Sequence, residues 1–339
     1  MTRPVRIGVI GLGYIGALHG RIMAQSGRAD VVAVADINAA RAEEIAQRIG
    51  AKAYASHAEM LKREKLDAVS VCLPDLLHVD VACAVANAGI PMLLEKPVAH
   101  TAEAARRIGA ALIASGTPCQ INHVLRSDPR YVLAHKQAAP ETLGEVIHVR
   151  AARNSVGALA RHLGKSTSIL FYLGVHDVDA VQWMARSQIR SVFARSVNKF
   201  GHANEDAIFV SFVLESGAIG TLEYSWAWPE GLHAGFNQQI ELVGTKGATG
   251  VDTRLDGFRI IHGTGEGSDD TYLWPEVNDR VGGCLRDNIE SFLIGVQTGK
   301  PFIQDWRDGI SAVEVLDAIR ESIRAGREVV VERQPIANA

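Results

Sequence analysis

Apolar and polar positions alternate in two different ways along the chain, and the change falls near residue 125. In the first part, short apolar runs are separated by stretches with helical spacing, which is the order of βαβ units. The predicted strands are residues 5–10, 31–35, 66–73, 91–94 and 118–123, and the predicted helices are residues 16–26, 39–49, 78–88 and 102–114. Such a chain is expected to form a parallel sheet with helices on both faces.

The second part carries several strand-like runs with no helix between them. Strands that follow one another without a crossover pair in an antiparallel sheet. The predicted strands are residues 145–153, 189–197, 207–214, 218–228, 237–243, 257–262 and 328–332, and the predicted helices are residues 168–184, 280–298 and 307–325. One face of this sheet needs a cover. Its other face is a candidate oligomer interface, so we expect a homodimer or a homotetramer.

Composition narrows the class of protein. A length of 339 residues fits about two domains, and 47% hydrophobic with 22% charged residues is ordinary globular composition. The chain has 35 Lys and Arg against 38 Asp and Glu, a net charge of −3, so it lacks the basic excess of a nucleic-acid-binding protein. No apolar run reaches about 18 residues, and we expect no contact with a membrane.

Cysteine usage and the N-terminus favour a cytoplasmic protein. The four cysteines are scattered without a CxxC pair, so we expect reduced thiols and no metal site. They are Cys72, Cys83, Cys119 and Cys284. The chain passes directly into the strand at residues 5–10, which is not the apolar core of a signal peptide.

A glycine fingerprint follows the first predicted strand and opens the first predicted helix. Its residues, in order, are Gly11, Leu12, Gly13, Tyr14, Ile15 and Gly16. In this context the first glycine permits a tight turn, the second lets the backbone approach a pyrophosphate, and the third lets the helix pack closely. The helix N-terminus favours the anion. The alternative is a domain of the same fold that binds no nucleotide.

The acidic residue that accompanies this fingerprint is also present. Asp36 lies 20 residues beyond Gly16, at the end of the second strand, where a carboxylate accepts hydrogen bonds from the adenosine ribose hydroxyls. A carboxylate at this position repels a 2′-phosphate. The nearest arginine, Arg41, is expected on a solvated helix face. The sequence therefore predicts NAD rather than NADP.

The fold class and the domain division follow. We predict an α/β protein in which residues 1–125 form an NAD-binding Rossmann domain with a doubly wound parallel sheet. Residues 126–339 are predicted to form a substrate-binding and oligomerisation domain of the α+β class, with an open, mainly antiparallel sheet.

A charged pair ends the fourth predicted strand. Glu95 and Lys96 are followed by Pro97, which disfavours helical geometry at Lys96. Cofactors and substrates collect at the carboxyl ends of parallel strands, and neighbours on a strand point to opposite faces. One of the two charged residues is therefore expected to face the nicotinamide. The alternative is a solvated surface pair.

These motifs together resemble the glucose–fructose oxidoreductase / inositol dehydrogenase family (Gfo/Idh/MocA), over essentially the whole chain. The segments that carry the resemblance are Gly11–Gly16, Asp36, Leu73-Pro74 with His78, Glu95-Lys96-Pro97 and the segment Gly174-Val175-His176-Asp177-Val178-Asp179. The resemblance implies a Rossmann domain followed by a domain with an open antiparallel sheet, and oxidation or reduction of a sugar, inositol or related polyol. It implies that Lys96 binds and polarises the reacting oxygen, and that His176 is the acid/base.

The resemblance also defines a cofactor site. It implies that Leu73, Pro74 and His78 lie along the cofactor. With the fingerprint and the charged pair, the residues assigned to the cofactor are Gly11, Gly13, Tyr14, Ile15, Gly16, Asp36, Leu73, Pro74, His78, Glu95 and Lys96.

The helix predicted at residues 168–184 carries the remaining catalytic candidates. Tyr172, His176, Asp179 and Trp183 share one face of a regular α-helix, and a histidine there can accept a proton near neutral pH. Asp179 is a candidate to orient His176 or contact substrate, or it serves the fold. Many relatives carry Asp where this chain has Tyr172. A neutral tyrosine either takes over an oxygen contact or packs, and this departure weakens the transfer of inositol specificity.

Basic residues near these elements are weaker candidates. Arg126 is either a substrate or cofactor contact or a structural salt bridge. The basic segment from Arg153 to Lys165 is either a loop that recognises an anionic substrate or a solvated loop.

The sequence thus predicts an NAD-dependent oxidoreductase that transfers hydride between a secondary alcohol or ketone of a polyol and the nicotinamide. Lys96 and His176 are expected at the reacting oxygen, with Tyr172 beside them. Three alternatives remain open: an NAD-dependent glycosidase, a non-catalytic dinucleotide-binding regulator, and a reductase acting on a keto-sugar.

Overall fold

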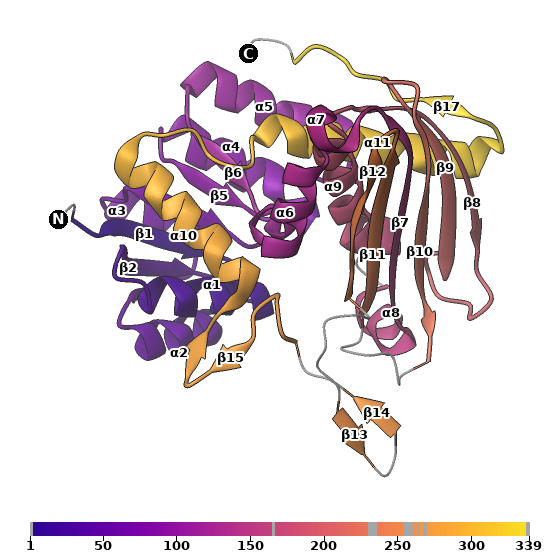
Figure 1. Cartoon of the computed structure of the whole chain (residues 1–339). Helices are drawn as coiled ribbons and strands as arrows, with labels where there is room; N and C mark the ends of the chain where they lie inside the picture. Colours follow the sequence, from indigo (N-terminus) through magenta and orange to yellow (C-terminus); the bar gives the residue numbers. More distant parts are fainter. Residues whose placement is uncertain are drawn as a thin grey trace. The chain divides into compact units, whose positions relative to one another are not determined.

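The computed structural model divides into two compact units, each with its own sheet (Figure 1). It describes residues 3–164, 167–229, 236–253, 260–262, 265–267 and 270–336. Unit 1 comprises Met1–Ser127, Tyr272–Val313 and Gln334–Ala339, and unit 2 comprises Asp128–Thr271 and Glu314–Arg333. The division differs from a single boundary at residue 125, because the chain returns to unit 1 after residue 271.

Unit 1 is built on a six-stranded parallel sheet in the order β3-β2-β1-β4-β5-β6. Its strands are β1 (Val5–Ile10), β2 (Ala29–Ala35), β3 (Lys52–Tyr54), β4 (Ala68–Val71), β5 (Met92–Leu94) and β6 (Cys119–Ile121). All five pairings are parallel, as predicted. The strand β3 was not predicted, because its three residues lack a continuous apolar run.

Helices cover this sheet, and several of their ends carry recognisable caps. They are α1 (Tyr14–Ala24), α2 (Ala39–Ile49), α3 (His57–Arg63), α4 (His78–Asn87), α5 (Ala102–Ser115) and α10 (Gly283–Thr298). In α5, the Thr101 hydroxyl accepts a hydrogen bond from the Ala104 N–H at 3.1 Å, and Gly116 ends the helix at φ 66°. Both are helix-terminating arrangements that satisfy backbone groups left without intrahelical partners.

The core of unit 1 joins segments far apart in the sequence. One buried cluster combines strand residues such as Ile7 and Val9 with Ile22 of α1, Ile45 of α2 and Phe292 of α10. Their side chains are at most 4% exposed. Helix α10 therefore covers the same sheet to which the first strand of the chain, β1, belongs.

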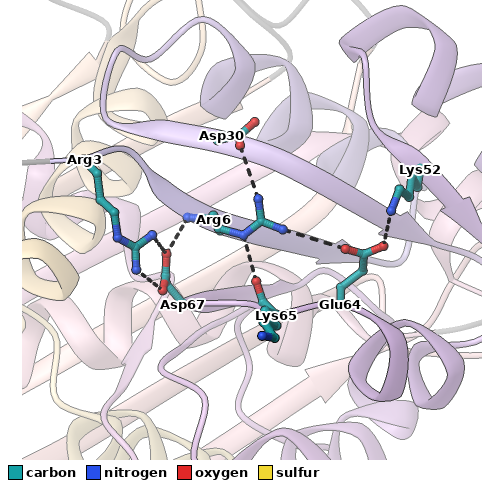
Figure 2. Close-up of polar contacts among 7 residues, drawn as sticks. All are labelled: Arg3, Arg6, Asp30, Lys52, Glu64, Lys65 and Asp67. Atoms are coloured by element: carbon teal, nitrogen blue, oxygen red, sulfur yellow. Dashed lines mark hydrogen bonds and ion pairs between the residues drawn. The ribbon is translucent and has the colours of Figure 1, made fainter.

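Charged side chains gather at the amino ends of these strands, as Figure 2 shows. The Arg3 guanidinium donates to both Asp67 carboxylate oxygens at 2.7 and 2.8 Å. Asp67 also accepts from the Arg6 N–H at 2.8 Å, and Arg6 lies 3.8 Å from both Asp30 and Glu64. This network lies at the edge of the sheet opposite the carboxyl ends, so it belongs to the structure of the sheet.

Unit 2 contains a seven-stranded sheet in the order β12-β11-β7-β10-β9-β8-β17. Its strands are β7 (Val146–Val156), β8 (Ile189–Val197), β9 (Ala207–Leu214), β10 (Ile219–Trp228), β11 (Phe236–Gly244), β12 (Gly247–Asp252) and β17 (Val329–Val330). The β7–β10 pair is parallel and the other pairs are antiparallel. The sheet is thus mixed and mainly antiparallel, which refines the predicted pairing.

Helices lie against one face of this sheet and leave the other open (Figure 1). Unit 2 includes α6 (Pro129–Gln137), α7 (Pro140–Leu143), α8 (Gly157–Leu163) and α9 (Val175–Ala185). The second half of α11 (Trp306–Ala325) also packs here, and its Ser322 hydroxyl accepts from the Ala194 N–H of β8 at 2.9 Å. Phe193, Phe209 and Ile219 are 36%, 58% and 60% exposed on the strands of the open face.

Two short hairpins complete the described residues. They are β13 (Ile260–His262) with β14 (Gly265–Gly267), and β15 (Glu276–Val277) with β16 (Arg280–Val281). Residues 257–259 of the strand predicted at 257–262 lie outside the described residues. No helix in the described ranges is both long enough and apolar enough to cross a bilayer.

Candidate active site

The glycine fingerprint forms the turn between β1 and α1. Gly11 has φ +83°, and a Cβ on it would lie 2.6 Å from the Cys72 carbonyl oxygen. A Cβ on Gly16 would lie 1.8 Å from the Gly11 carbonyl oxygen. Both positions therefore require glycine for the turn itself. A Cβ on Gly13 would meet no described atom within 4 Å, so this position is open toward a ligand.

The start of α1 offers unsatisfied backbone donors beside that open position. Gly13 is the N-cap of α1, and no side chain caps the helix there. The first N–H groups of an uncapped helix and its dipole favour a diphosphate. Tyr14 is 67% exposed at the first turn and meets the Trp274 ring edge-on at a centroid distance of 6.2 Å. These residues fit a dinucleotide.

Asp36 stands at the carboxyl end of β2, next to the fingerprint. Its carboxylate accepts the Leu12 N–H at 2.7 Å and the Asn38 N–H at 2.8 Å. Arg41 donates from Nε to the Leu12 carbonyl at 2.9 Å and pairs with Glu44 at 2.8 Å. Arg41 is thus engaged with the fingerprint backbone as well as with its own helix.

The segment after β4 also reaches the fingerprint. A Cβ on Gly11 would lie 2.8 Å from Leu73 Cδ2, so Leu73 borders the glycine turn. His78 is fully buried, with Nε2 2.8 Å from the Leu73 carbonyl and Nδ1 3.0 Å from the Pro97 carbonyl. His78 therefore holds the Leu73 segment against the residues that follow Lys96. Its contact with a cofactor stays a prediction.

The residues around Glu95 form a buried polar cluster at the carboxyl ends of β4, β5 and β6. His19 of α1 lies 3.3 Å from Glu95 Oε1 through Nε2 and 2.9 Å from the Ser70 hydroxyl through Nδ1. The Asn122 amide donates to Glu95 Oε1. Glu95 Oε2 accepts the backbone N–H of Lys96 at 3.2 Å. We refer to His19, Glu95 and Asn122 as the Glu95 cluster.

The charges of this cluster stabilise one another. Burial acts to lower the pKa of His19, but Cys72 and Glu95 outweigh it and raise that pKa to about 10. Burial acts to raise the pKa of Glu95, but His19, Lys96 and Asn122 lower it below its usual value. The two shifts have opposite directions, and both favour the charged forms of His19 and Glu95.

Arg126 forms a salt bridge, which was one of the two roles predicted for it from the sequence. Its side chain is 6% exposed, and Nη1 donates to Asp308 Oδ2 at 2.7 Å. Both residues belong to unit 1. A contact between Arg126 and substrate stays a prediction.

The helix that carries His176 begins differently from the prediction. Residues Leu170–Gly174 form a π-helical turn, and α9 starts only at Val175. Insertions of this kind recur at functional sites. The regular spacing that placed Tyr172 on the face of His176 therefore does not apply across the turn. Tyr172 and His176 are half-buried, whereas Asp179 is 1% exposed.

The other predicted member of that face has a packing role. The Trp183 ring stacks on the His135 ring of α6, with centroids 4.1 Å apart and planes inclined by 10°. An offset stack of this kind is a common aromatic packing arrangement.

A buried ion pair fixes the first turn of α9 to the sheet of unit 2. Arg153 of β7 donates to Asp177 from Nε at 3.0 Å and from Nη2 at 2.7 Å, and both side chains are at most 4% exposed. Burial raises the pKa of Asp177, while Arg153 opposes the rise. Arg153 thus lies on the strand predicted at residues 145–153, and β7 and α8 continue through most of the segment that was expected to be a loop. Of that basic segment, Lys165 lies outside the described residues.

Close packing holds the same turn from β10. The Tyr224 hydroxyl donates to the Gly174 carbonyl at 3.3 Å. A Cβ on Gly174 would lie 3.1 Å from Tyr224 Cε2 and 3.1 Å from Leu170 Cδ1. Glycine at this position lets the π-helical turn approach the tyrosine ring.

The sequence did not predict the role of His19 or the pairing of Arg153 with Asp177. His19 was not singled out, although a histidine among small and apolar residues of the first helix is a signal for a buried polar partner. The pairing of Arg153 with Asp177 was missed because the two residues are 24 positions apart on different elements.

In unit 1 the structure brings Asp36, Leu73 and the fingerprint together, and Tyr172, His176 and Asp179 lie in unit 2. In neither described part does a group of three His, Cys, Asp or Glu residues have metal-binding geometry.

A parallel sheet with a dinucleotide fingerprint, followed by a unit with an open mixed sheet, defines a class of nicotinamide-dependent oxidoreductases. Residues 5–123 match the profile described as "Oxidoreductase family, NAD-binding Rossmann fold". Residues 131–249 match the "GFO/IDH/MocA C-terminal domain". The chain belongs to the Gfo/Idh/MocA family and is an NAD-binding oxidoreductase.

Similar proteins of known name extend over nearly the whole chain. The inositol 2-dehydrogenase of Rubrobacter xylanophilus is 26% identical over 98% of this chain and 94% of its own length. That of Agrobacterium fabrum is 32% identical over 74% of this chain and 76% of its own length. The crystal structure of GenD2 from gentamicin A biosynthesis in complex with NAD is 26% identical, with a TM-score of 0.83 and 98% of each chain covered.

Proposed function

We propose that this protein is an NAD-dependent dehydrogenase of a secondary alcohol on a sugar, an inositol or a related polyol. The observation that carries the proposal is the position of Lys96. It lies two residues beyond the end of β5, at the same edge of the parallel sheet as Gly11 and Asp36. The relatives named inositol 2-dehydrogenase support a polyol as the class of substrate.

The roles of the residues follow from their chemistry. Gly13 and the start of α1 would hold the diphosphate, and Asp36 would receive the ribose hydroxyls. When bound, NAD accepts a hydride at C4 of the nicotinamide. Lys96 donates a hydrogen bond to the reacting oxygen and stabilises its developing negative charge.

His176 acts as the acid/base. It takes the hydroxyl proton as hydride leaves, a contribution worth roughly 10²–10⁴-fold in rate. Tyr172 contacts a substrate oxygen from the π-helical turn. Arg126 and Asp179 are the weaker substrate-site candidates, and both are already engaged in buried or nearly buried positions.

The test is NADH fluorescence after incubation with NAD and a panel of inositols, aldoses and sugar acids. We expect signal with one substrate class in the wild type. Lys96→Met and His176→Ala are expected to lower kcat by about 10²-fold or more, while the Kd for NAD stays within about twofold. Loss of NAD binding in either variant would instead assign that residue to the structure of the site.

Two other outcomes separate the alternatives of the same fold. Release of a chromogenic leaving group from glycosides, dependent on NAD but without net NADH, would identify a glycosidase. Tight NAD binding with no turnover of any compound would identify a regulator.

We also propose that a second copy of the chain covers the open face of the unit 2 sheet. A groove of about 590 Å³ runs over this face, lined by Phe193 and Ile219 and by the opposite charges of Arg150 and Glu241. Exposed apolar patches of this kind mark interaction sites, and mixed charges suit a self-complementary interface. Light scattering is expected to show a dimer or tetramer for the wild type and monomers for Phe209→Glu/Ile219→Glu.

We further propose a cytoplasmic location. The cysteines of the chain, Cys72, Cys83, Cys119 and Cys284, are all free thiols, which suits a reducing compartment.

A further inference from the structure

Glu95 divides its two carboxylate oxygens between two parts of unit 1. Oε1 faces His19 of α1, at 3.3 Å, and accepts from the Asn122 amide that follows β6. Oε2 accepts the backbone N–H of Lys96 at 3.2 Å. The side chain is 9% exposed, so water does not satisfy these groups in place of the protein.

His19 connects this carboxylate to the helix of the fingerprint. It lies three residues after Gly16 in α1 and is fully buried. The Asn122 amide also lies 3.3 Å from His19 Nε2, so the three side chains contact one another. A single cluster therefore joins α1, the end of β5 and the end of β6.

We propose that the Glu95 cluster is a positioning device that fixes the backbone of Lys96 relative to the dinucleotide-binding helix. The proposal rests on the function proposed above, in which Lys96 acts at the reacting oxygen. Glu95, His19 and Asn122 are positioning residues. They act through Lys96 and hold its peptide rather than contacting substrate.

Stability alone does not explain these residues. Replacing a buried ion pair by apolar side chains of similar volume is often neutral or stabilising. Only the polar arrangement offers an acceptor to the Lys96 N–H. It also places a negative charge beside the Lys96 side chain, whose own charge in turn stabilises the Glu95 carboxylate.

Three variants test the proposal. Glu95→Leu removes the charge and the acceptor at similar volume, and Glu95→Gln keeps the shape and one acceptor. Asn288→Leu is the matched control, because Asn288 accepts a buried hydrogen bond from Gln120 of β6 at 2.7 Å in the same unit. Thermal unfolding is recorded for all three variants.

The kinetic readout separates positioning from structure. Glu95→Leu is expected to lower kcat by about 10²-fold with the Kd for NAD within about twofold, since small displacements of a catalytic group cost rate rather than cofactor binding. Glu95→Gln is expected to restore part of kcat. Asn288→Leu is expected to lower the thermal midpoint without lowering kcat. Wild-type kcat in Glu95→Leu, with Lys96→Met inactive, would overturn the proposal while leaving the proposed function intact.

A second readout does not depend on turnover. Hydrogen exchange at the Lys96 amide can be followed in a peptide that consists of residues 95–97. The first residue of such a peptide does not report exchange and Pro97 has no N–H, so only the Lys96 amide remains. In Glu95→Leu this amide is expected to exchange about tenfold faster than in the wild type, because its acceptor is gone. Unchanged exchange would overturn the positioning contact. If the wild type turns over no substrate and the Lys96 amide still exchanges faster in Glu95→Leu, the contact exists and the proposed function has failed.

Discussion

A buried carboxylate stands next in the chain to each proposed catalytic residue, but the two carboxylates have different partners. In unit 1, Glu95 precedes Lys96 and pairs with His19. In unit 2, Asp177 follows His176 and pairs with Arg153. Both ion pairs fix a backbone segment to a neighbouring element, α1 in the first case and β7 in the second.

The choice of cation makes the two pairs respond differently to pH. Arginine stays charged at any pH the fold survives, whereas histidine titrates. Glu95 has a lowered pKa within a cluster of several donors. Asp177 has a raised pKa, because burial outweighs its single cation. The comparison shows that the cation of the Glu95 pair can lose its proton as pH rises, whereas the cation of the Asp177 pair keeps it.

The largest expected effect comes from breaking the Arg153–Asp177 pair. Arg153→Met leaves a buried carboxylate without its cation and is expected to cost about 3–5 kcal/mol of stability. Chemical denaturation checks this value. The double variant Arg153→Met/Asp177→Leu is the control and is expected to regain most of the loss. Equal instability of both variants would mean that packing, and not charge, holds the turn.

The second prediction concerns pH. The pKa of His19 rises from its usual 6.5 to about 10 on folding, so its contribution to stability is complete below pH 6.5 and is lost as pH rises through 10. Glu95 has a lowered pKa, so its contribution is present above its usual range and is lost in acid. The thermal midpoint of the wild type is therefore expected to decrease as pH rises from 6.5 to 10.

Two variants isolate that pH dependence. Glu95→Gln removes the partner of His19, so its thermal midpoint is expected to fall less over the same range. Asp177→Asn leaves His19 and Glu95 in place, so the wild-type slope is expected to remain. Parallel slopes for the wild type and Glu95→Gln would show that other groups cause the dependence.

A smaller effect is expected at the close contact between Gly174 and Tyr224. Gly174→Ala places a methyl group 3.1 Å from the Tyr224 ring and is expected to cost about 1–3 kcal/mol. Combining it with Tyr224→Leu is expected to recover part of that cost. Full stability of Gly174→Ala would mean that the ring shifts without strain.

The smallest effect is expected in the exposed network of Figure 2. The Arg3 side chain is 68% exposed, and ion pairs at such positions are screened by solvent and salt. Arg3→Ala is expected to shift the thermal midpoint less than either buried variant. Added salt should reduce the difference from the wild type further. A shift as large as that of Arg153→Met would remove the distinction between exposed and buried pairs.

The sequence predicted the elements whose residues carry a strong local pattern. The strands at residues 189–197 and 207–214 have the predicted bounds. The fingerprint was equally readable, since Gly11 and Gly16 are required by the turn itself. The short strands β3 and β12 were missed, because three to six residues with few apolar side chains form strands only through their neighbours.

The parts of the site that the sequence did not predict depend on contacts between distant residues. The π-helical turn at Leu170–Gly174 is invisible to a search for regular spacing. The contact of His19 with Glu95 joins residues 76 positions apart, and no local pattern encodes such a pair. The fold could thus be predicted from the periodicity of the sequence, whereas the contacts that support the candidate site are seen only in the structure.

The return of the chain to unit 1 sets the order in which the protein can fold during synthesis. Val281, Leu285, Ile289 and Phe292 belong to the same buried cluster as Ile7 and Val9. A ribosome that has released only the first 127 residues has therefore delivered an unfinished core. The apolar surface of that intermediate stays uncovered until the segment that ends at Val313 has emerged. A truncation after residue 127 would leave the same surface uncovered permanently, which makes it an unsuitable boundary for expressing the nucleotide-binding half alone.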